Sequence, residues 1–278
     1  MSSAVRPLRV AAAQAESVPG DVAANVATAV SLVTAAADQG ARVVVLPELF
    51  LTGYDESAWT HEAGLSLDPS TGHRELLSPL SEVAASRSVV VVVGAAVRRA
   101  LDETSLSVLV VGKDGEITAP YDKQHLCHEE RDFFEPGDHG ATIVVDGWDL
   151  ALGVCYDGCF PEHAMSATAG GASAYLVPAA YYVGAEHRRD VYYAARALDN
   201  GIYVAFAGLT GTCGAGSFSG GTAVYDPEGR PVRRLGLEPG VVVADLDADE
   251  VARVQREHPM AADRRDSLGP RTRVELAG

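Results

Sequence analysis

The chain has 278 residues, and 47% of them are hydrophobic, which is enough to bury a sizeable core. Its net charge of −16 disfavours nucleic acid as a partner, because affinity for phosphates depends on Lys and Arg. No apolar run approaches the roughly 20 residues of a membrane-spanning helix. The apolar run at residues 10–13 is also shorter than a signal-peptide core of roughly 7 residues or more. We therefore expect a cytoplasmic protein without a membrane partner.

The first third of the chain predicts a β-α-β arrangement followed by a second helix and strand. Residues 9–14 and 42–46 are short apolar segments typical of buried strands, and residues 21–38 between them have helical spacing. A helix is expected over residues 73–87. The five consecutive valines at 89–93 favour a strand that is covered on both faces.

The middle of the chain predicts two hairpins and a helix. Residues 105–111 and 116–119 flank a Gly-Lys-Asp-Gly turn, and residues 141–145 and 149–154 flank Gly147. Pro161 precedes a helix expected over residues 162–169, where proline suits the first turn. Antiparallel hairpins beside β-α-β units predict mixed sheets.

Alternation continues to the end of the chain. Strands are expected at residues 174–177, 202–207, 222–225 and 241–245, helices at 186–198 and 249–257, and a glycine-rich stretch at 208–221. The charged tail, residues 258–278, is expected to wrap a surface or a partner. Without a linker of Pro and Ser, the pattern predicts a single α/β domain over residues 1–278.

Three segments place reactive side chains just past predicted strands, where open α/β sheets build their sites. They carry Glu48 after Leu46-Pro47, Lys123 after Tyr121-Asp122, and Cys155 after Gly153-Val154. A thiol with a pKa of about 8.5 needs a neighbouring base to attack, and Glu48 is suited to that role. An ammonium such as Lys123 stabilises a developing oxyanion. Together the three side chains predict acyl-transfer chemistry with Cys155 as nucleophile.

Two alternative readings concern metals and cofactors. Cys155, Cys159 and His163 are spaced i, i+4, i+8, and His125, Cys127 and His128 lie close together, so a metal site is an alternative. Asp157, Gly158 and Pro161 interrupt any helix between Cys155 and His163, so those three side chains would not share one face. The chain lacks the glycine-rich phosphate-binding motifs of nucleotide enzymes. We therefore expect neither a metal nor a cofactor. Cys159 and Cys213 are expected to be structural, whereas Cys127 is a candidate for the pocket wall.

The same segments resemble the signature of the nitrilase, or carbon–nitrogen hydrolase, superfamily. The matching stretches are Pro47-Glu48, Tyr121-x-Lys123-x-His125-Leu126, Gly153-x-Cys155-Tyr156-Asp157-x-x-Phe160-Pro161-Glu162 and Ala195-Arg196-Ala197-x-x-Asn200. The resemblance implies a four-layer α-β-β-α sandwich with two mixed sheets. It also implies assembly as a homodimer or larger homo-oligomer through outer helices.

The resemblance further implies a second glutamate after the lysine, which helps to position the substrate or the triad. Glu130 matches best before the Phe134-Glu135-Pro136-Gly137 turn, and a one-residue gap would exchange it with Glu129. One departure is Cys159, which stands where members of the family often carry Arg. Because no paired arginines follow Cys155, an N-carbamoyl amino acid substrate is less favoured.

The expected function is hydrolysis of a small amide through a thioester on Cys155, with release of ammonia or an amine. Tyr156 is expected to help bind the substrate, its backbone N–H facing the oxyanion, and Tyr181 and Tyr182 are candidate pocket walls. One arginine of the run at 186–190 is a further candidate. Hydrolysis of an N-carbamoyl compound or of a nitrile remains open, as does a non-catalytic binding protein on the same fold.

Overall fold

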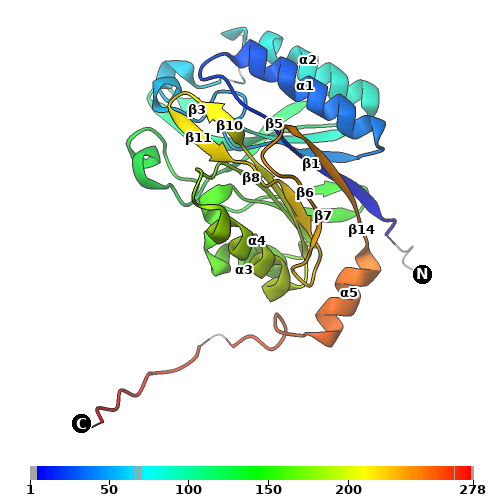
Figure 1. Cartoon of the computed structure of the whole chain (residues 1–278), viewed down its shortest axis with the longest axis vertical. Coiled ribbons are helices and arrows are strands. Elements are labelled where there is room, and N and C mark those ends of the chain that lie inside the picture. The colour runs from blue at the N-terminus through cyan, green and yellow to red at the C-terminus, as the bar shows by residue number, and fades with distance from the viewer. Residues whose placement is uncertain (1–4, 66, 68–70, 266, 277–278) are drawn as a thin grey trace.

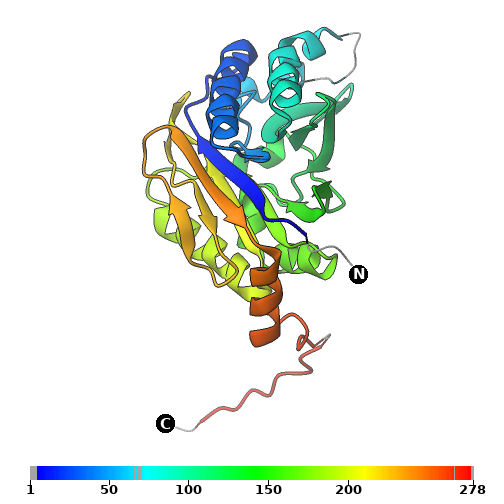
Figure 2. The same ribbon diagram turned by 90° about the vertical axis from the view of Figure 1, so that its right-hand side faces the viewer.

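The computed structural model describes residues 5–65, 67, 71–265 and 267–276. Two six-stranded sheets pack face to face, and pairs of helices cover the two outer faces (Figures 1 and 2). The expected α-β-β-α layering is confirmed. Nearly all of the buried apolar side chains lie between these layers.

The first sheet is mixed, with parallel strands in its centre. Its spatial order is β14 (Gly240–Leu246), β1 (Leu8–Gln14), β2 (Val43–Val45), β3 (Val90–Ala100), β4 (Glu103–Val111) and β5 (Ile117–Asp122). Strands β1, β2 and β3 are parallel, and the other neighbours are antiparallel. Strand β5 therefore runs in the same direction as β2, so both end at the same edge of the sheet.

The second sheet repeats this arrangement. Its order is β13 (Pro231–Arg234), β12 (Ala223–Tyr225), β9 (Tyr203–Gly208), β8 (Ala174–Ala179), β7 (Trp148–Leu152) and β6 (Thr142–Val145). Strands β7, β8 and β9 are parallel, and the outer pairs are antiparallel. Strands β1, β2 and β3 of the first sheet contact β8 and β9 across the interface.

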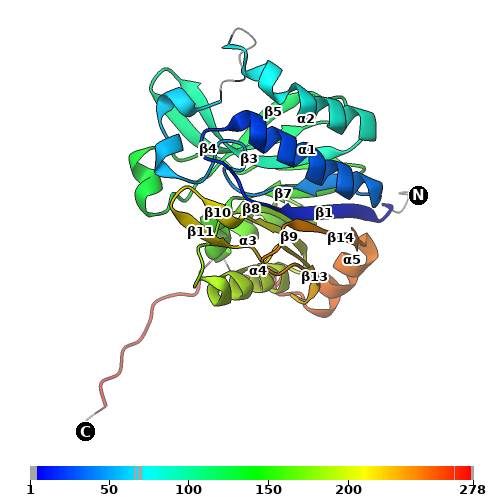
Figure 3. The same ribbon diagram turned by 45° about the horizontal axis from the view of Figure 1, so that its top comes forward.

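The helices lie where the apolar patterns predict them. Helices α1 (Val22–Asp38) and α2 (His73–Arg87) cover the first sheet, and α3 (Pro161–Ala169) and α4 (Glu186–Asn200) cover the second (Figure 3). Asp21 caps α1, because its side chain accepts a hydrogen bond of 3.0 Å from the backbone N–H of Ala24. None of the described helices has the length and apolar composition needed to cross a bilayer.

Two segments differ from the sequence expectations. The glycine-rich stretch contains a separate hairpin, β10 (Thr210–Cys213) with β11 (Gly216–Ser219), because its glycines permit a tight turn with positive φ at Gly214. After α5 (Ala248–Glu257) the described tail residues are exposed and extend away from the body (Figure 1). The tail does not wrap the surface of its own chain, and its contact with a partner stays a prediction.

Candidate active site

Cys155 lies in a tight turn directly after β7, at the start of the short 3₁₀ helix η5 (Cys155–Cys159). Its φ angle is +40°, which few residues other than glycine adopt. Such a backbone conformation costs free energy and persists only where surrounding contacts hold it. The turn brings the side chain to the end of β7, with its Sγ 3.6 Å from the carbonyl oxygen of Ala180.

Glu48 follows β2 on the facing sheet, in a turn that also carries strain. The next residue, Leu49, has a φ angle of +47°. The turn packs so closely on Gly94 of β3 that a Cβ atom there would lie 2.4 Å from the backbone nitrogen of Leu49 and 2.6 Å from the Cα of Glu48. Glycine at position 94 is therefore required for Glu48 to occupy this place.

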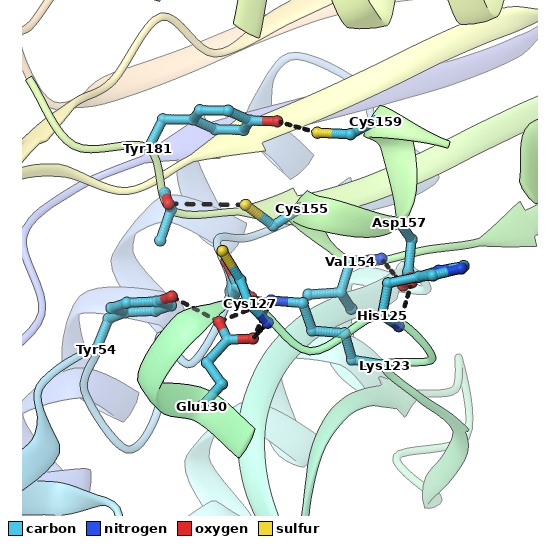
Figure 4. A network of polar contacts seen from close by, with 12 residues as sticks. Tyr54, Lys123, His125, Cys127, Glu130, Val154, Cys155, Asp157, Cys159 and Tyr181 are labelled. Carbon is cyan, nitrogen blue, oxygen red and sulfur yellow. Dashed lines mark hydrogen bonds and ion pairs between the residues drawn. The ribbon is translucent and has the colours of Figure 1, made fainter. Parts of the chain in front are cut away.

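Lys123 follows β5 and is completely buried among carboxylates. Its Nζ lies 2.6 Å from Oε1 of Glu48. The same atom lies 2.7 Å from each carboxylate oxygen of Glu130 (Figure 4). A buried ammonium needs such partners, because an unpaired charge in the interior is costly. The strand ends thus bring together Glu48, Lys123 and Cys155, which lie far apart in the sequence.

Glu130 is the glutamate that reaches the site, whereas Glu129 is exposed to solvent. It lies in the 3₁₀ helix η4 (His128–Asp132) and is 1% exposed. Its carboxylate accepts hydrogen bonds from the Tyr54 hydroxyl at 2.5 Å and from the backbone N–H of Cys127 at 2.8 Å. Both oxygens of Glu130 are thereby held by donors, which fixes the carboxylate rigidly beside Lys123.

The surroundings of Glu48, Lys123 and Cys155 shift the pKa of each of these three groups. Burial raises the pKa of Glu48 to about 7, against the opposing charge of Lys123. Burial alone would lower the pKa of Lys123, but the carboxylates of Glu48 and Glu130 raise it well above its ordinary value. The thiol of Cys155 also has a pKa well above the ordinary value, because of burial and of the Glu48 charge.

The remaining oxygen of Glu48, Oε2, is buried and has no hydrogen-bond partner. An unpartnered carboxylate oxygen in the interior is unfavourable unless another group uses it. Because the neighbouring thiol is neutral at rest, Oε2 is available to accept its proton. Chemically, the cluster combines a neutral thiol, a carboxylate with a pKa near neutrality and a buried ammonium.

Cys155, Lys123 and Glu130 lie on a cavity of about 780 Å³. Tyr156, Tyr181 and Tyr182 line it, and their part in substrate binding stays a prediction. Cavities of this size with apolar and aromatic walls and a few polar groups are typical of small-molecule sites.

Among the aromatic wall residues that the sequence did not indicate are Tyr54 and Trp59. Their rings stand edge to face, 5.1 Å apart, and the ring of Tyr182 meets Tyr54 in the same way at 6.2 Å. The aromatic cluster directly after the Glu48 turn was the available signal, but nothing in it shows which rings face the cavity.

Other candidate residues divide between the cavity and the core. Cys127 lines the cavity, and so does Cys159, which was expected to be structural. The Cys159 sulfur lies 3.4 Å from the Tyr181 hydroxyl, because η5 turns it toward the same opening as Cys155. Of the arginines in the 186–190 run, Arg188 lines the cavity, whereas Arg189 is buried and bonds the backbone carbonyls of Ser219 and Gly220.

Within the described ranges, no group of three or more His, Cys, Asp or Glu side chains is arranged to hold a metal ion. His125 instead donates its backbone N–H, at 2.9 Å, to the carboxylate of Asp157, and its ring stacks on Phe160 with centroids 3.9 Å apart. These contacts give His125 a structural role.

The fold and the site together define a hydrolase class of protein, and comparison with known proteins specifies it. Residues 9–256 match the family model described as carbon-nitrogen hydrolase. The 2-oxoglutaramate amidase of Bacillus subtilis (strain 168) is 30% identical over 82% of this chain and 86% of its own length. A nitrilase of Pyrococcus abyssi (strain GE5 / Orsay) is 32% identical over 80% of this chain and 83% of its own length.

Among solved structures, an amidase from Nesterenkonia AN1, described as a member of the nitrilase superfamily, superposes with a TM-score of 0.81 at 29% identity, over 95% of this chain and 96% of that one. Another structure of that amidase shows the acetamide moiety of fluoroacetamide added covalently at its active-site cysteine. It superposes with a TM-score of 0.79 at 29% identity, over 93% of this chain and 98% of that one.

The chain belongs to the carbon–nitrogen hydrolase family, as the sequence motifs implied. Within the nitrilase superfamily it is amidase-like, and it is a hydrolase of the kind that acts on amides.

Proposed function

We propose that the protein hydrolyses the carbon–nitrogen bond of small amides through a thioester on Cys155. The observation that carries the proposal is the buried Glu48–Lys123–Glu130 cluster beside Cys155 at the cavity. A positioned base beside a nucleophile and a fixed cation for the oxyanion are the groups that acyl transfer needs.

In the first step, the Cys155 sulfur attacks the amide carbon while Oε2 of Glu48 takes the thiol proton. Lys123 and the backbone N–H of Tyr156 hold the oxyanion that forms. The carbon–nitrogen bond then breaks, and the proton passes from Glu48 to the leaving nitrogen. Ammonia or an amine departs, and the acyl group stays on sulfur.

In the second step, Glu48 takes a proton from water as the water attacks the thioester carbon. The carbon–sulfur bond breaks, the carboxylic acid leaves, and the proton returns to Cys155. Glu130 keeps Lys123 in place throughout, because both of its carboxylate oxygens lie 2.7 Å from the ammonium nitrogen. No redox or nucleotide step is required for these atoms and electrons to balance.

The charges of the cavity favour a neutral amide over one that carries a carboxylate. Asp55, Glu56 and Glu129 are among the lining residues, against one guanidinium, that of Arg188. Asp55 stays ionised, because hydrogen bonds from Ser57 and from the backbone N–H of Ala215 lower its pKa. Carboxylates around a cleft raise the free energy of an incoming anion, most strongly at low salt.

A substrate panel tests the proposal. It compares aliphatic amides, ω-amides of dicarboxylic acids, N-carbamoyl amines and amino acids, and nitriles for ammonia release. We expect neutral aliphatic amides to lead and Cys155→Ala to abolish their turnover. Ammonia from nitriles alone would refute the amidase function and favour a nitrilase. Release of ammonia together with carbon dioxide from N-carbamoyl compounds would favour an N-carbamoyl amidohydrolase.

We also infer a homodimer or larger homo-oligomer. The outward face of α4 exposes Val191 and Leu198, whose side chains are 51% and 46% exposed, and the tail extends away from the body. Apolar side chains on one outer helix are typical of a subunit contact. Light scattering coupled to gel filtration tests this inference, and Leu198→Glu is expected to shift the mass toward a monomer.

A further inference from the structure

Asp157 is a buried carboxylate that does not line the cavity. Its side chain is completely enclosed, two residues after Cys155 in η5. A buried carboxylate is costly unless hydrogen bonds compensate it. Burial opposes ionisation of Asp157, yet hydrogen bonds from His125, Tyr121 and Val154 hold its pKa below the ordinary value.

One set of these bonds closes the turn that carries Cys155. Oδ2 of Asp157 accepts from the backbone N–H of Val154 at 3.0 Å, and the backbone N–H of Asp157 donates to the Val154 carbonyl at 2.9 Å. Residues 154 and 157 are therefore joined twice across Cys155. Together with the Tyr193 hydroxyl, which donates to the Cys155 carbonyl at 2.8 Å, these bonds hold Cys155 at its positive φ angle.

A second set joins the same carboxylate to the segment that carries Lys123. The Tyr121 hydroxyl donates to Oδ2 at 2.6 Å. The backbone N–H of His125 donates to Oδ1 at 2.9 Å (Figure 4). Tyr121 and His125 flank Lys123 two residues before and two after it. A single carboxylate thus connects the nucleophile turn of one sheet to the lysine segment of the other.

A buried chain of hydrogen bonds orients the Tyr121 hydroxyl toward Asp157. Tyr175 OH lies 2.9 Å from Nδ1 of His163, and Nε2 of His163 lies 2.8 Å from Tyr121 OH. Burial lowers the pKa of His163 and raises those of both tyrosines, so the imidazole is neutral and the phenols are protonated. Each proton then points along the chain from Tyr175 to Asp157.

We propose that Asp157 is a positioning residue that fixes the Cys155 sulfur relative to the Lys123 ammonium. The inference rests on the roles proposed above for these two groups. Misplacement of reacting groups by about 1 Å can lower a rate by 10²-fold, so a rigid link between the two segments has a direct catalytic consequence. The carboxylate acts only through its neighbours.

The direct variant is Asp157→Asn, which keeps the shape but replaces one acceptor oxygen with an NH₂ group facing donors. We expect kcat to fall by about 10²-fold with KM changed by less than about threefold, as for a misaligned transition state. Because this change also weakens a buried network, a matched pair of milder variants separates the loss of positioning from the loss of stability.

Tyr121→Phe and Tyr175→Phe form the pair. Each removes one buried hydroxyl bonded to His163, so a similar fall in Tm is expected for both, but only Tyr121 touches Asp157. We expect Tyr121→Phe to lower kcat for the best amide about tenfold with KM nearly unchanged. Tyr175→Phe is expected to keep kcat within about threefold of the wild type. Equal losses of kcat in the two variants would show a merely structural network and overturn the proposal.

An alkylation measurement separates this inference from the proposed amide activity. Iodoacetamide carries a carbonyl oxygen for Lys123 to bind, whereas allyl bromide alkylates thiols without one. The ratio of the two rates at Cys155, read by peptide mass, is expected to fall about fivefold in Tyr121→Phe and to stay constant in Tyr175→Phe. An unchanged ratio in both overturns the positioning role, even where no amide tested is a substrate.

Discussion

Replacement of Glu48 by Gln tests the base of the mechanism most directly. Gln keeps the shape of the side chain and an oxygen for the Lys123 ammonium, but it cannot accept a proton at Oε2. We expect kcat/KM to fall by 10²- to 10⁴-fold, the usual range for loss of a positioned general base. Cys155, Lys123 and the cavity stay in place in this variant.

The pH dependence of kcat/KM also tests whether Glu48 is the base. Because burial raises the pKa of Glu48 to about 7, the wild-type carboxylate is protonated and inactive as a base below that pH. Its kcat/KM is therefore expected to rise with pH through about 7 and then level off. Glu48→Gln is expected to lose this acid limb, leaving a low rate that does not change between pH 5 and 8.

The same shift makes the stability of the wild type depend on pH. The pKa of Glu48 is about 7 in the folded state and 4.5 in the unfolded chain, so the folded state binds more protons between these values. The contribution of Glu48 to the free energy of unfolding is complete below pH 4.5 and is lost as the pH rises through 7. The change is roughly 3 kcal/mol. In Glu48→Gln this decline in the free energy of unfolding is expected to disappear.

Two measurements check the reasoning: kcat/KM across pH for both proteins, and urea unfolding at pH 5 and pH 8. An unchanged acid limb near pH 7 in Glu48→Gln would assign that pKa to another group. A rate within tenfold of the wild type would exclude Glu48 as the base. Equal pH dependence of unfolding in both proteins would contradict the raised pKa itself.

Three further outcomes are expected. Lys123→Ala should lower kcat at least 10²-fold and, because it leaves two buried carboxylates without their cation, also lower Tm by several degrees in a melting curve. Gly94→Ala should cost about 1–3 kcal/mol in urea unfolding, since its new Cβ meets the backbone of Leu49, and a wild-type midpoint would contradict this close contact. Limiting iodoacetamide should label Cys155 before the other three cysteines, as peptide mass will show; earlier labelling of another one, with loss of activity, would reassign the nucleophile.

The sequence by itself determined the alternation of strands and helices and the three segments that carry Glu48, Lys123 and Cys155. Both are local properties: apolar periodicity reflects which face of an element is buried, and each reactive residue directly follows a strand that the pattern predicts. The motifs around them were specific enough to indicate the family before any distance was known. The hairpin of strands β10 and β11 was not predicted, because residues typical of turns dominate its composition.

Only the tertiary structure decided which groups meet. It distinguishes Glu130 from Glu129, because the hydrogen bonds to Lys123 and Tyr54 depend on how η4 packs against the strand ends. It likewise places Tyr54 on the cavity wall and turns Asp157 away from it. Two neighbouring glutamates have the same local sequence pattern. Which of them is buried, and what it contacts, follows from the packing of two sheets whose contacting segments lie far apart in the chain.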